Sequence, residues 1–284
     1  MKVVVITIAP PVAYGVTALL RGLGHDVPGV VMMRPRQPEA LAEFLRDPPE
    51  RLDVLFPSGP DRIAALLRCF EPDLAVCSGF GWRIPEDALV VPRLGIVNGH
   101  PSLLPKYRGP NPFGWTFRNG DRELGFTFHV MDAEFDTGPI LAQGTKPLTD
   151  EDSAQDATEL LAPLVMKLLP QALARLESGD RGDPQPTDGA SYAPVFEDEY
   201  AEIDWTRPAR DVHNQVRSWF VPTASGIMGA LTTLDGERVR VKRTRLLEAR
   251  STGAAPGTVL AREDGEFIVQ CGDGPIRVVR TEPA

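Results

Sequence analysis

The sequence has few of the residues that build disulfide frameworks and metal centres. Its 284 residues include only 3 cysteines and 4 histidines. Cys69, Cys77 and Cys271 are odd in number and lack short paired spacing, and the histidines stand far apart. Structural disulfides and zinc sites are marked by such pairs. We therefore expect free thiols and no bound metal.

Long apolar runs are missing as well. The N-terminal run at residues 3–8 stops before Pro10 and Pro11, so it is shorter than the core of a secretory signal. No other segment approaches the roughly 20 apolar residues that a membrane helix needs. We expect a cytoplasmic protein that makes no membrane contact.

A third absence concerns nucleotide-binding loops. The turn after the first apolar run, residues 9–15, reads Ala-Pro-Pro-Val-Ala-Tyr-Gly and contains neither G-x-G-x-x-G nor G-K-[ST]. Its prolines lack the backbone N–H groups that would bind a pyrophosphate. The sequence therefore argues against a dinucleotide cofactor and against a nucleoside triphosphate.

The residues that are present are typical of a globular chain, with 42% hydrophobic and 24% charged residues. The length suits one larger and one smaller domain. A formal net charge of -9 disfavours binding to a phosphate backbone. Nucleic acid is thus an unlikely partner by charge.

The order of predicted elements favours an α/β fold. A β-branched run at residues 3–8 precedes a helical pattern at 16–23 and a second apolar run at 27–33. Short connections between strand, helix and strand imply parallel strands, so we predict a doubly wound, mostly parallel sheet. Functional groups gather at the carboxyl ends of such strands. The pattern continues with a helix at 63–69 and strands at 74–78, 95–98 and 125–130.

A long amphipathic helix is expected from residue 152 to residue 177. Its apolar residues recur at three- and four-residue spacing, with Asp152 or Ser153 as the N-cap and Gly179 as the stop. Pro163 and Pro170 interrupt this pattern, which predicts a kink or a break.

The polar stretch at 178–189 is rich in glycine and proline and predicts a surface connector near a domain boundary. We therefore predict domains at 1–190 and 191–284. The second has a helical pattern at 209–220 and then short strands separated by Asp-Gly turns, so it should be β-rich. Basic residues alternate with valines between Arg238 and Arg245, which indicates the solvated face of a strand; a binding role for this cluster stays open.

Two polar runs carry the residues suited to chemistry. The first begins with Asn98 and His100 at the end of a predicted strand, and its prolines at 101 and 105 stiffen a loop that displays side chains. The second places Asp132, Glu134 and Asp136 within five positions. Three such carboxylates repel one another unless a cation or a shared proton lies nearby, and an imidazole from the first run would supply that.

Together these runs resemble the folate-dependent formyltransferase family. The likeness rests on N-x-H at Asn98 and His100, on S-L-L-P-x-x-R-G from Ser102 to Gly109, and on D-x-G at Asp136. It implies that Asn98, His100 and Asp136 are catalytic and that 10-formyltetrahydrofolate is the formyl donor.

The resemblance also implies a pterin-binding loop at residues 78–85, whose backbone near Trp82 and Ile84 hydrogen-bonds the pterin, with the 132–136 loop closing the other side. The cofactor-binding residues implied in this way are Phe80, Gly81, Trp82, Ile84, Asp132 and Glu134.

The C-terminal part resembles a region shared by methionyl-tRNA formyltransferases and sugar N-formyltransferases. Tyr192-Ala193-Pro194 and Ile203-Asp204-Trp205 carry this likeness. It implies a smaller β-rich, OB-like C-terminal domain, and it disfavours a glycinamide ribonucleotide formyltransferase, which lacks this region.

The chemistry of formyl transfer suits the three residues. Attack by an amine produces a negative oxygen, toward which the Asn98 amide and a His100 ring N–H can donate. Asp136 can accept the amine proton, directly or through a water, and its charge favours protonated His100. His129, inside a predicted strand, fits the core or a place behind the site.

The acceptor is predicted from departures within the family. The tRNA enzymes carry a basic insertion where residues 34–50 are short and acidic here, and they usually have a lysine where this chain has Val195. We therefore favour a small-molecule amine: an amino sugar nucleotide, a hydroxyornithine-type compound or another specialised metabolite. Candidate substrate-binding residues are Ser102, Lys106, Tyr107 and Arg108.

Three alternatives stay open at this stage. They are a methionyl-tRNA formyltransferase acting on initiator tRNA, a 10-formyltetrahydrofolate hydrolase and a folate-binding module without catalysis. The sequence is compatible with a monomer or a homodimer.

Overall fold

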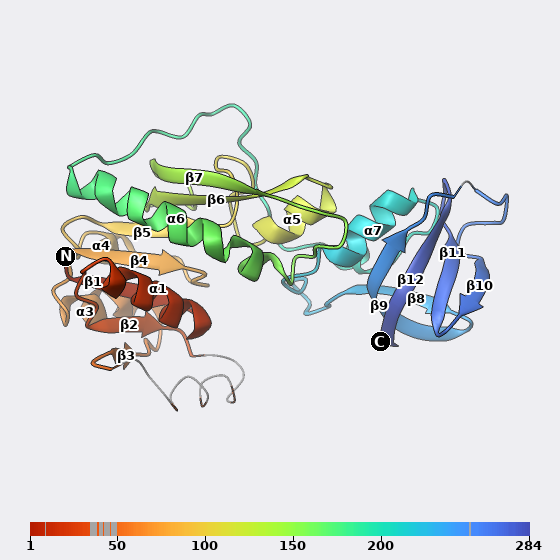
Figure 1. Cartoon of the computed structure of the whole chain (residues 1–284). Coiled ribbons are helices and arrows are strands. Elements are labelled where there is room, and N and C mark those ends of the chain that lie inside the picture. The colour runs from red at the N-terminus through yellow and green to blue at the C-terminus, as the bar shows by residue number, and fades with distance from the viewer. Residues whose placement is uncertain (9, 35–38, 40–41, 43–45, 47–49, 250) are drawn as a thin grey trace. The chain divides into compact units, whose positions relative to one another are not determined.

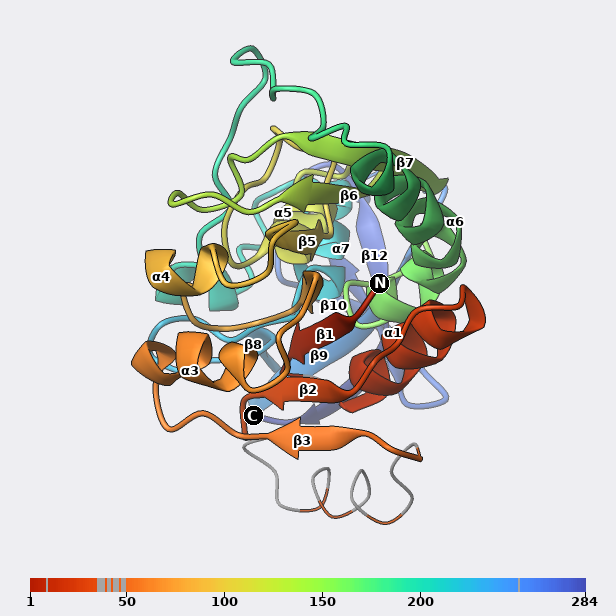
Figure 2. The same cartoon turned by 90° about the vertical axis from the view of Figure 1, so that its left-hand side faces the viewer.

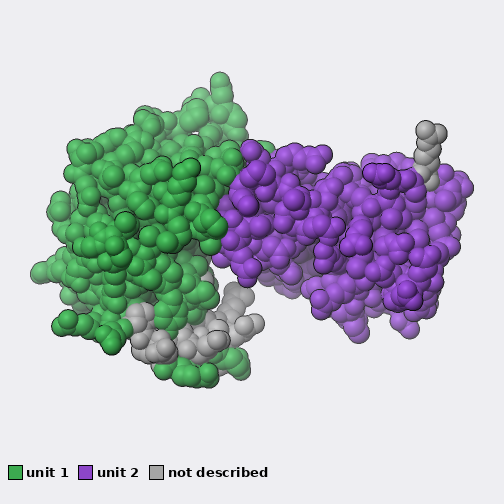
Figure 3. Space-filling view, in the orientation of Figure 1, with its two compact units in different colours: residues 1–108, 125–145, 162–191 green, residues 109–124, 146–161, 192–284 purple. Residues whose placement is uncertain are grey.

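The computed structural model describes residues 1–284 except 9, 35–38, 40–41, 43–45, 47–49 and 250. The stretch at 34–50, predicted to be too short for a basic insertion, lies largely outside the described residues. The chain divides into two compact units, coloured separately in Figure 3. Unit 1 consists of Met1–Arg108, Gly125–Thr145 and Ala162–Ser191, and unit 2 of Gly109–Leu124, Lys146–Leu161 and Tyr192–Ala284.

A seven-stranded sheet, with strand order β3-β2-β1-β4-β5-β6-β7, is the centre of the N-terminal fold (Figure 1). The pairs from β3 to β5 are parallel, and β5 pairs with β6 in the antiparallel sense. The predicted mostly parallel α/β sheet is thus confirmed. Its strands are β1 Val3–Thr7, β2 Gly29–Met32, β3 Asp53–Leu55, β4 Leu74–Ser78, β5 Ile96–His100, β6 Glu123–Val130 and β7 Ile140–Pro147.

Helices cover both faces of this sheet. In Figure 2, α1 and α6 lie on one face, and α3 and α4 lie on the other. Every residue of β1 and β2 is buried, as expected for parallel strands covered on two sides. The helices of this part are α1 Pro10–Gly22, η1 Pro60–Arg62, α3 Ile63–Arg68, α4 Glu86–Leu89 and α6 Ala157–Glu177. None of the helices in the described part of the chain is both long and apolar enough to span a membrane.

Two helices differ from their predicted limits. Helix α1 begins at Pro10, whereas the sequence suggested a turn there; proline needs no N–H partner in the first turn of a helix. Helix α6 runs unbroken through Pro163 and Pro170, so of the predicted kink or break the break is wrong. The buried leucines of its apolar face hold it together despite the lost hydrogen bonds. The predicted N-cap is also wrong, because the helix begins at Ala157, beyond Asp152 and Ser153.

Unit 2 contains a five-stranded antiparallel sheet with strand order β10-β11-β12-β9-β8. Asp235-Gly236 and Asp264-Gly265 have positive φ at both residues and connect two of its hairpins, as the sequence predicts. The predicted β-rich C-terminal region is confirmed. The elements of this part are α5 Pro112–Arg118, η2 Asp198–Ala201, α7 Ala209–Arg217, β8 Ala230–Leu234, β9 Glu237–Leu246, β10 Val259–Glu263, β11 Glu266–Gln270 and β12 Pro275–Pro283.

Candidate active site

The site begins at the end of β5. Asn98 and His100 are two positions apart in the strand, so their side chains point to the same face of the sheet. Gly99 lies between them, and a Cβ there would come within 2.9 Å of the Phe126 ring and 3.1 Å of the Phe128 ring. The β5–β6 register places Asn98 opposite His129. The end of β5 therefore presents two of the three predicted catalytic residues on one face, and its antiparallel neighbour β6 places His129 beside them.

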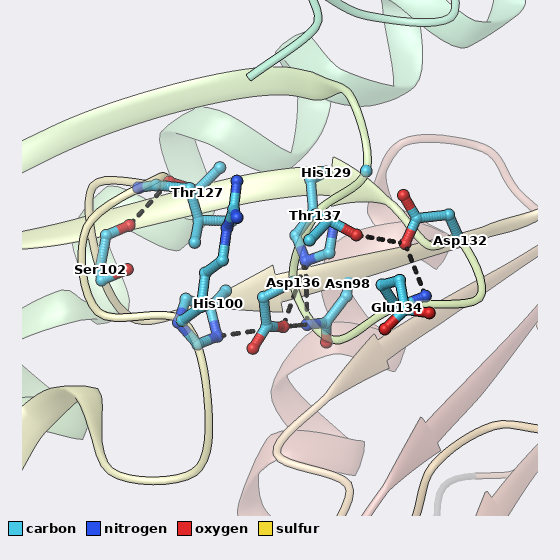
Figure 4. Close-up of polar contacts among 12 residues, drawn as sticks. Asn98, His100, Ser102, Thr127, His129, Asp132, Glu134, Asp136 and Thr137 are labelled. Carbon is cyan, nitrogen blue, oxygen red and sulfur yellow. Dashed lines mark hydrogen bonds and ion pairs between the residues drawn. The ribbon is translucent and has the colours of Figure 1, made fainter. Parts of the chain in front are cut away.

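Asp136 reaches the same place from the loop between β6 and β7. Its Oδ1 lies 3.3 Å from Asn98 Nδ2, 3.4 Å from His100 Nδ1 and 3.6 Å from His129 Nε2 (Figure 4). The side chains of His100 and Asp136 are only 6% and 12% exposed. The three residues of the N-x-H and D-x-G motifs thus meet around one carboxylate oxygen.

The Tyr107 carbonyl determines which nitrogen of His100 carries a proton. His100 Nε2 lies 2.8 Å from this oxygen, which can only accept, so Nε2 must donate. Nδ1 then faces Asp136 Oδ1, and a hydrogen bond between them requires one proton that the two groups share. Burial lowers the pKa of His100, while the Asp136 charge and the Tyr107 carbonyl act to raise that pKa.

His129 lies behind the site, as the sequence suggested. Its Nδ1 donates to the Val130 carbonyl at 3.1 Å, which leaves Nε2 to accept from Asn98 Nδ2 at 3.2 Å. The Asn98 amide therefore has one hydrogen directed at His129 and one at Asp136. Cys77 is the neighbour of Asn98 in β4, and burial raises the pKa of its thiol to about 12, so it is uncharged.

The candidate substrate-binding residues fall into two groups. Ser102 and Arg108 bind within the protein: Ser102 Oγ donates to the Lys106 carbonyl at 2.6 Å, and the Arg108 guanidinium donates to Gln185 at 2.6 and 3.1 Å. Tyr107 is buried, and Lys106 is exposed, with its Nζ 4.5 Å from the centroid of the Tyr107 ring. Lys106 is therefore the one of the four that presents a charge at the surface.

The predicted pterin loop, residues 78–85, is joined to the Asp136 loop because Arg83 donates to the Ala133 carbonyl. The rings of Phe80 and Trp82 meet edge to face with centroids 5.9 Å apart, and Ile84 is buried. Among the described residues, no backbone hydrogen bond involves the N–H or carbonyl of Trp82 or Ile84. A loop that recognises a pterin through its backbone would use groups of this kind, without a backbone partner of their own.

The other two predicted cofactor residues lie in the loop beside it. Asp132 Oδ1 accepts from Thr137 Oγ1 at 2.7 Å and from the Glu134 backbone N–H at 3.2 Å (Figure 4). Asp132 thus shapes the loop that carries Asp136, and Glu134 is exposed. The described residues include no group of three or more His, Cys, Asp or Glu side chains suited to a metal ion.

Sequence reasoning missed Gln185. This residue lies in the stretch predicted to be a surface connector, yet its amide donates to the carbonyls of Asp136 and Gly138, at 2.8 Å each. A single polar residue among prolines and glycines carries no sequence signal for such a role.

Comparison with known proteins shows the family of the chain. Residues 57–173 match the formyl transferase family, and residues 196–284 match the formyl transferase C-terminal domain. Methionyl-tRNA formyltransferases of Pelobacter propionicus and Sinorhizobium medicae are each 36% identical, over 259 and 279 residues. These alignments cover 87% and 93% of this chain and 78% and 86% of those proteins.

A solved structure shares the fold over almost the whole length. The N-formyltransferase from Helicobacter canadensis, in complex with folinic acid and dTDP-3-aminofucose, superposes with a TM-score of 0.67 and 16% identity, covering 99% of both chains. The family models and the identities of 36% decide the assignment. The chain belongs to the formyl transferase family and carries its C-terminal domain, as the sequence motifs predicted.

Proposed function

We propose that this folate-dependent formyltransferase moves the formyl group of 10-formyltetrahydrofolate to the amine of a small-molecule acceptor, with Asn98, His100 and Asp136 carrying the chemistry. The observation that carries the proposal is their convergence: Asp136 Oδ1 lies 3.3 Å from the Asn98 amide nitrogen and 3.4 Å from His100 Nδ1. An amide donor, an imidazole and a carboxylate are the groups that formyl transfer needs in one place.

The 78–85 loop and the Asp136 loop would hold the donor. The backbone groups of Trp82 and Ile84, which have no backbone partner among the described residues, support this, as does the Arg83 bond that ties the two loops together. When bound, the formyl folate would supply a carbonyl carbon for the amine to attack; after the new C–N bond has formed, the bond from that carbon to the folate nitrogen would break. Asp132 shapes this site through its hydrogen bonds within the loop.

Asn98 stabilises the negative charge that develops on the formyl oxygen. Its bond to Asp136 at 3.3 Å is longer than the usual N–H···O distance, so a formyl oxygen placed beside this hydrogen would compete with the carboxylate for it. Its bond to His129 at 3.2 Å holds the amide plane meanwhile. A donor aimed at developing charge in this way is worth about 100- to 1,000-fold in rate.

His100 and Asp136 move the proton. The amine loses one proton as it attacks, and the leaving nitrogen must gain one. The shared proton between Nδ1 and Oδ1 lets the pair give a proton to the leaving nitrogen and take one from the amine, so its own proton content is restored. The Tyr107 carbonyl keeps Nε2–H out of this exchange and fixes the ring.

A small acceptor is favoured by the charges of unit 2. A phosphate backbone would need free cations, but the five basic side chains between Arg238 and Arg245 pair with three carboxylates of this unit, which offset three of the five positive charges. Displacing those carboxylates would reduce the free energy that contacts with phosphates could contribute to binding. The pairs are Arg238–Glu202, Arg240–Glu282, Lys242–Glu282, Arg243–Glu151 and Arg245–Glu151.

Methionyl-tRNA formyltransfer is the second candidate. The names of the relatives from Pelobacter propionicus and Sinorhizobium medicae favour it, since both are methionyl-tRNA formyltransferases. The partial charge pairing along β9 and a net charge of -9 weigh against it.

An acceptor screen separates the candidates. The protein is incubated with 10-formyltetrahydrofolate and, separately, dTDP-3-aminofucose, an N-hydroxyornithine, initiator methionyl-tRNA or no acceptor, and products are identified by mass spectrometry. We expect one formylated small amine, unmodified tRNA and no formate without an amine. Formylation of the tRNA alone would replace the first proposal by the second. Formate released at full rate without any amine would indicate a hydrolase.

A further inference from the structure

The side chain of Gln185 joins the two loops that build the site. Its Nε2 donates to the carbonyl oxygens of Asp136 and Gly138 at 2.8 Å each, and its Oε1 accepts from Arg108 Nη2 and Nε at 2.6 and 3.1 Å. Carbonyls only accept and a guanidinium only donates, so this orientation of the amide is the one that satisfies every partner. Both donors and both lone pairs of the amide are used.

Each end of this bridge is next to a group of the site. Asp136 has a left-handed φ of 56°, a conformation that costs energy in a residue other than glycine and that the bond to its carbonyl helps to maintain. Arg108 directly follows Tyr107, whose carbonyl accepts from His100 Nε2. The two residues that Gln185 links therefore carry the two sides of the His100–Asp136 contact.

The segment around Gln185 has its own anchors. Asp183 exchanges two backbone hydrogen bonds with Ile140, at 2.8 and 2.9 Å. Ser191 Oγ accepts from the Tyr107 N–H, and the Ser191 carbonyl accepts from the Arg108 N–H, both at 2.9 Å. After α6 this part of the chain runs without a helix or a strand (Figure 1). Its path is fixed at both ends, so changing the Gln185 side chain should leave the backbone in place.

We propose that Gln185 is a positioning residue: it holds Asp136 Oδ1 3.4 Å from His100 Nδ1 and so sets the geometry of the shared proton. The inference rests on the proposed roles of His100 and Asp136. Gln185 touches neither of these two side chains; it acts through the Asp136 backbone and through Arg108.

The first test compares turnover in three variants. Gln185→Leu keeps the size of the side chain and removes all four hydrogen bonds. Gln185→Glu keeps a partner for Arg108 but turns an oxygen toward the two carbonyls. A displacement of the carboxylate by about 1 Å should lower kcat roughly 100-fold in both, with little change in the KM for 10-formyltetrahydrofolate. Thr187→Ala, an exposed change in the same segment, should match the wild type.

The second test needs no acceptor. The titration of His100 is followed by NMR in wild type, Gln185→Leu and Thr187→Ala, with His100→Gln to assign its signal. Burial lowers the pKa of His100, as does the neighbouring His129, whereas Asp136 and the Tyr107 carbonyl raise it, so a displaced carboxylate should move the titration to lower pH. A loss of folded protein alone would not move it.

The outcomes separate this inference from the proposed function. Wild-type kcat in Gln185→Leu, or a lowered kcat with an unmoved His100 titration, would overturn the positioning role. Asp136→Asn is measured alongside. If Asp136→Asn turns over like the wild type, the proposed catalytic roles of His100 and Asp136 are refuted, whatever the result for the Gln185 variants.

Discussion

Gly138 of the D-x-G motif has no room for a side chain, and this makes Gly138→Ala a sharp test of how the site is positioned. A Cβ at this position would lie 1.8 Å from the Val130 carbonyl oxygen. Since a carbon and an oxygen approach to about 3.3 Å, the two segments must separate by about 1.5 Å. Val130 N–H donates to the Pro139 carbonyl at 2.9 Å, so the strand cannot move away from Gly138 without straining this hydrogen bond.

That separation acts two residues from Asp136. Its contacts with Asn98 and His100, at 3.3 and 3.4 Å, are already long and would be lost. We expect kcat to fall about 100-fold or more, and the free energy of unfolding to fall by about 1–3 kcal/mol. Gly15→Ala is the control, because Gly15 is an exposed residue of α1 where an added Cβ would have no atom within 4 Å. It should keep full activity and gain about 0.5–1 kcal/mol.

Steady-state rates and urea unfolding of the two variants are the assay. Wild-type kcat in a folded Gly138→Ala protein would refute the reasoning that the backbone at Gly138 places Asp136.

Two further predictions concern unit 2. Burial lowers the pKa of His213 from 6.5 to about 4, so as the pH falls this side chain is protonated in the unfolded chain before it is protonated in the folded protein. The free energy of unfolding is therefore at its full value above about pH 6.5 and falls by about 3 kcal/mol as the pH drops to 4. Urea unfolding between pH 6.5 and 4.5 should show this slope, and His213→Gln should flatten it; an equal slope in both proteins would contradict the assignment. Glu151→Gln should free Arg243 and Arg245 and raise the salt concentration needed to elute the protein from heparin, whereas unchanged elution would show that these pairs do not mask charge.

The parts of the site that could be predicted from the sequence have local signals. Asn98 and His100 follow an apolar strand at a spacing of two, which places them on one face of a sheet. The D-x-G motif follows the next strand, and antiparallel pairing of β5 with β6 brings Asp136 back to them. Strand periodicity and motif order were therefore enough to predict that the three residues lie together; their catalytic role stays what the family resemblance implies.

Other features could not be predicted because they depend on distant partners. Gln185 binds residues 49 and 77 positions away, so no local pattern marks it. The partners of the cluster from Arg238 to Arg245 also come from elsewhere in the chain, such as Glu151 and Glu282. The turn predicted at the start of α1 and the break predicted in α6 were wrong for a related reason, since tertiary packing decides whether a helix tolerates proline.

The most direct test of the central claim is the single-turnover rate of formyl transfer in Asp136→Asn. The amide keeps the size of the carboxylate but cannot share a proton with His100 Nδ1 as the acid does. Asp188→Asn, an exposed change in unit 1, is the matched control. We predict a rate lowered about 100- to 10,000-fold in Asp136→Asn and an unchanged rate in Asp188→Asn. Transfer at the wild-type rate by folded Asp136→Asn would contradict the claim that this cluster performs the reaction.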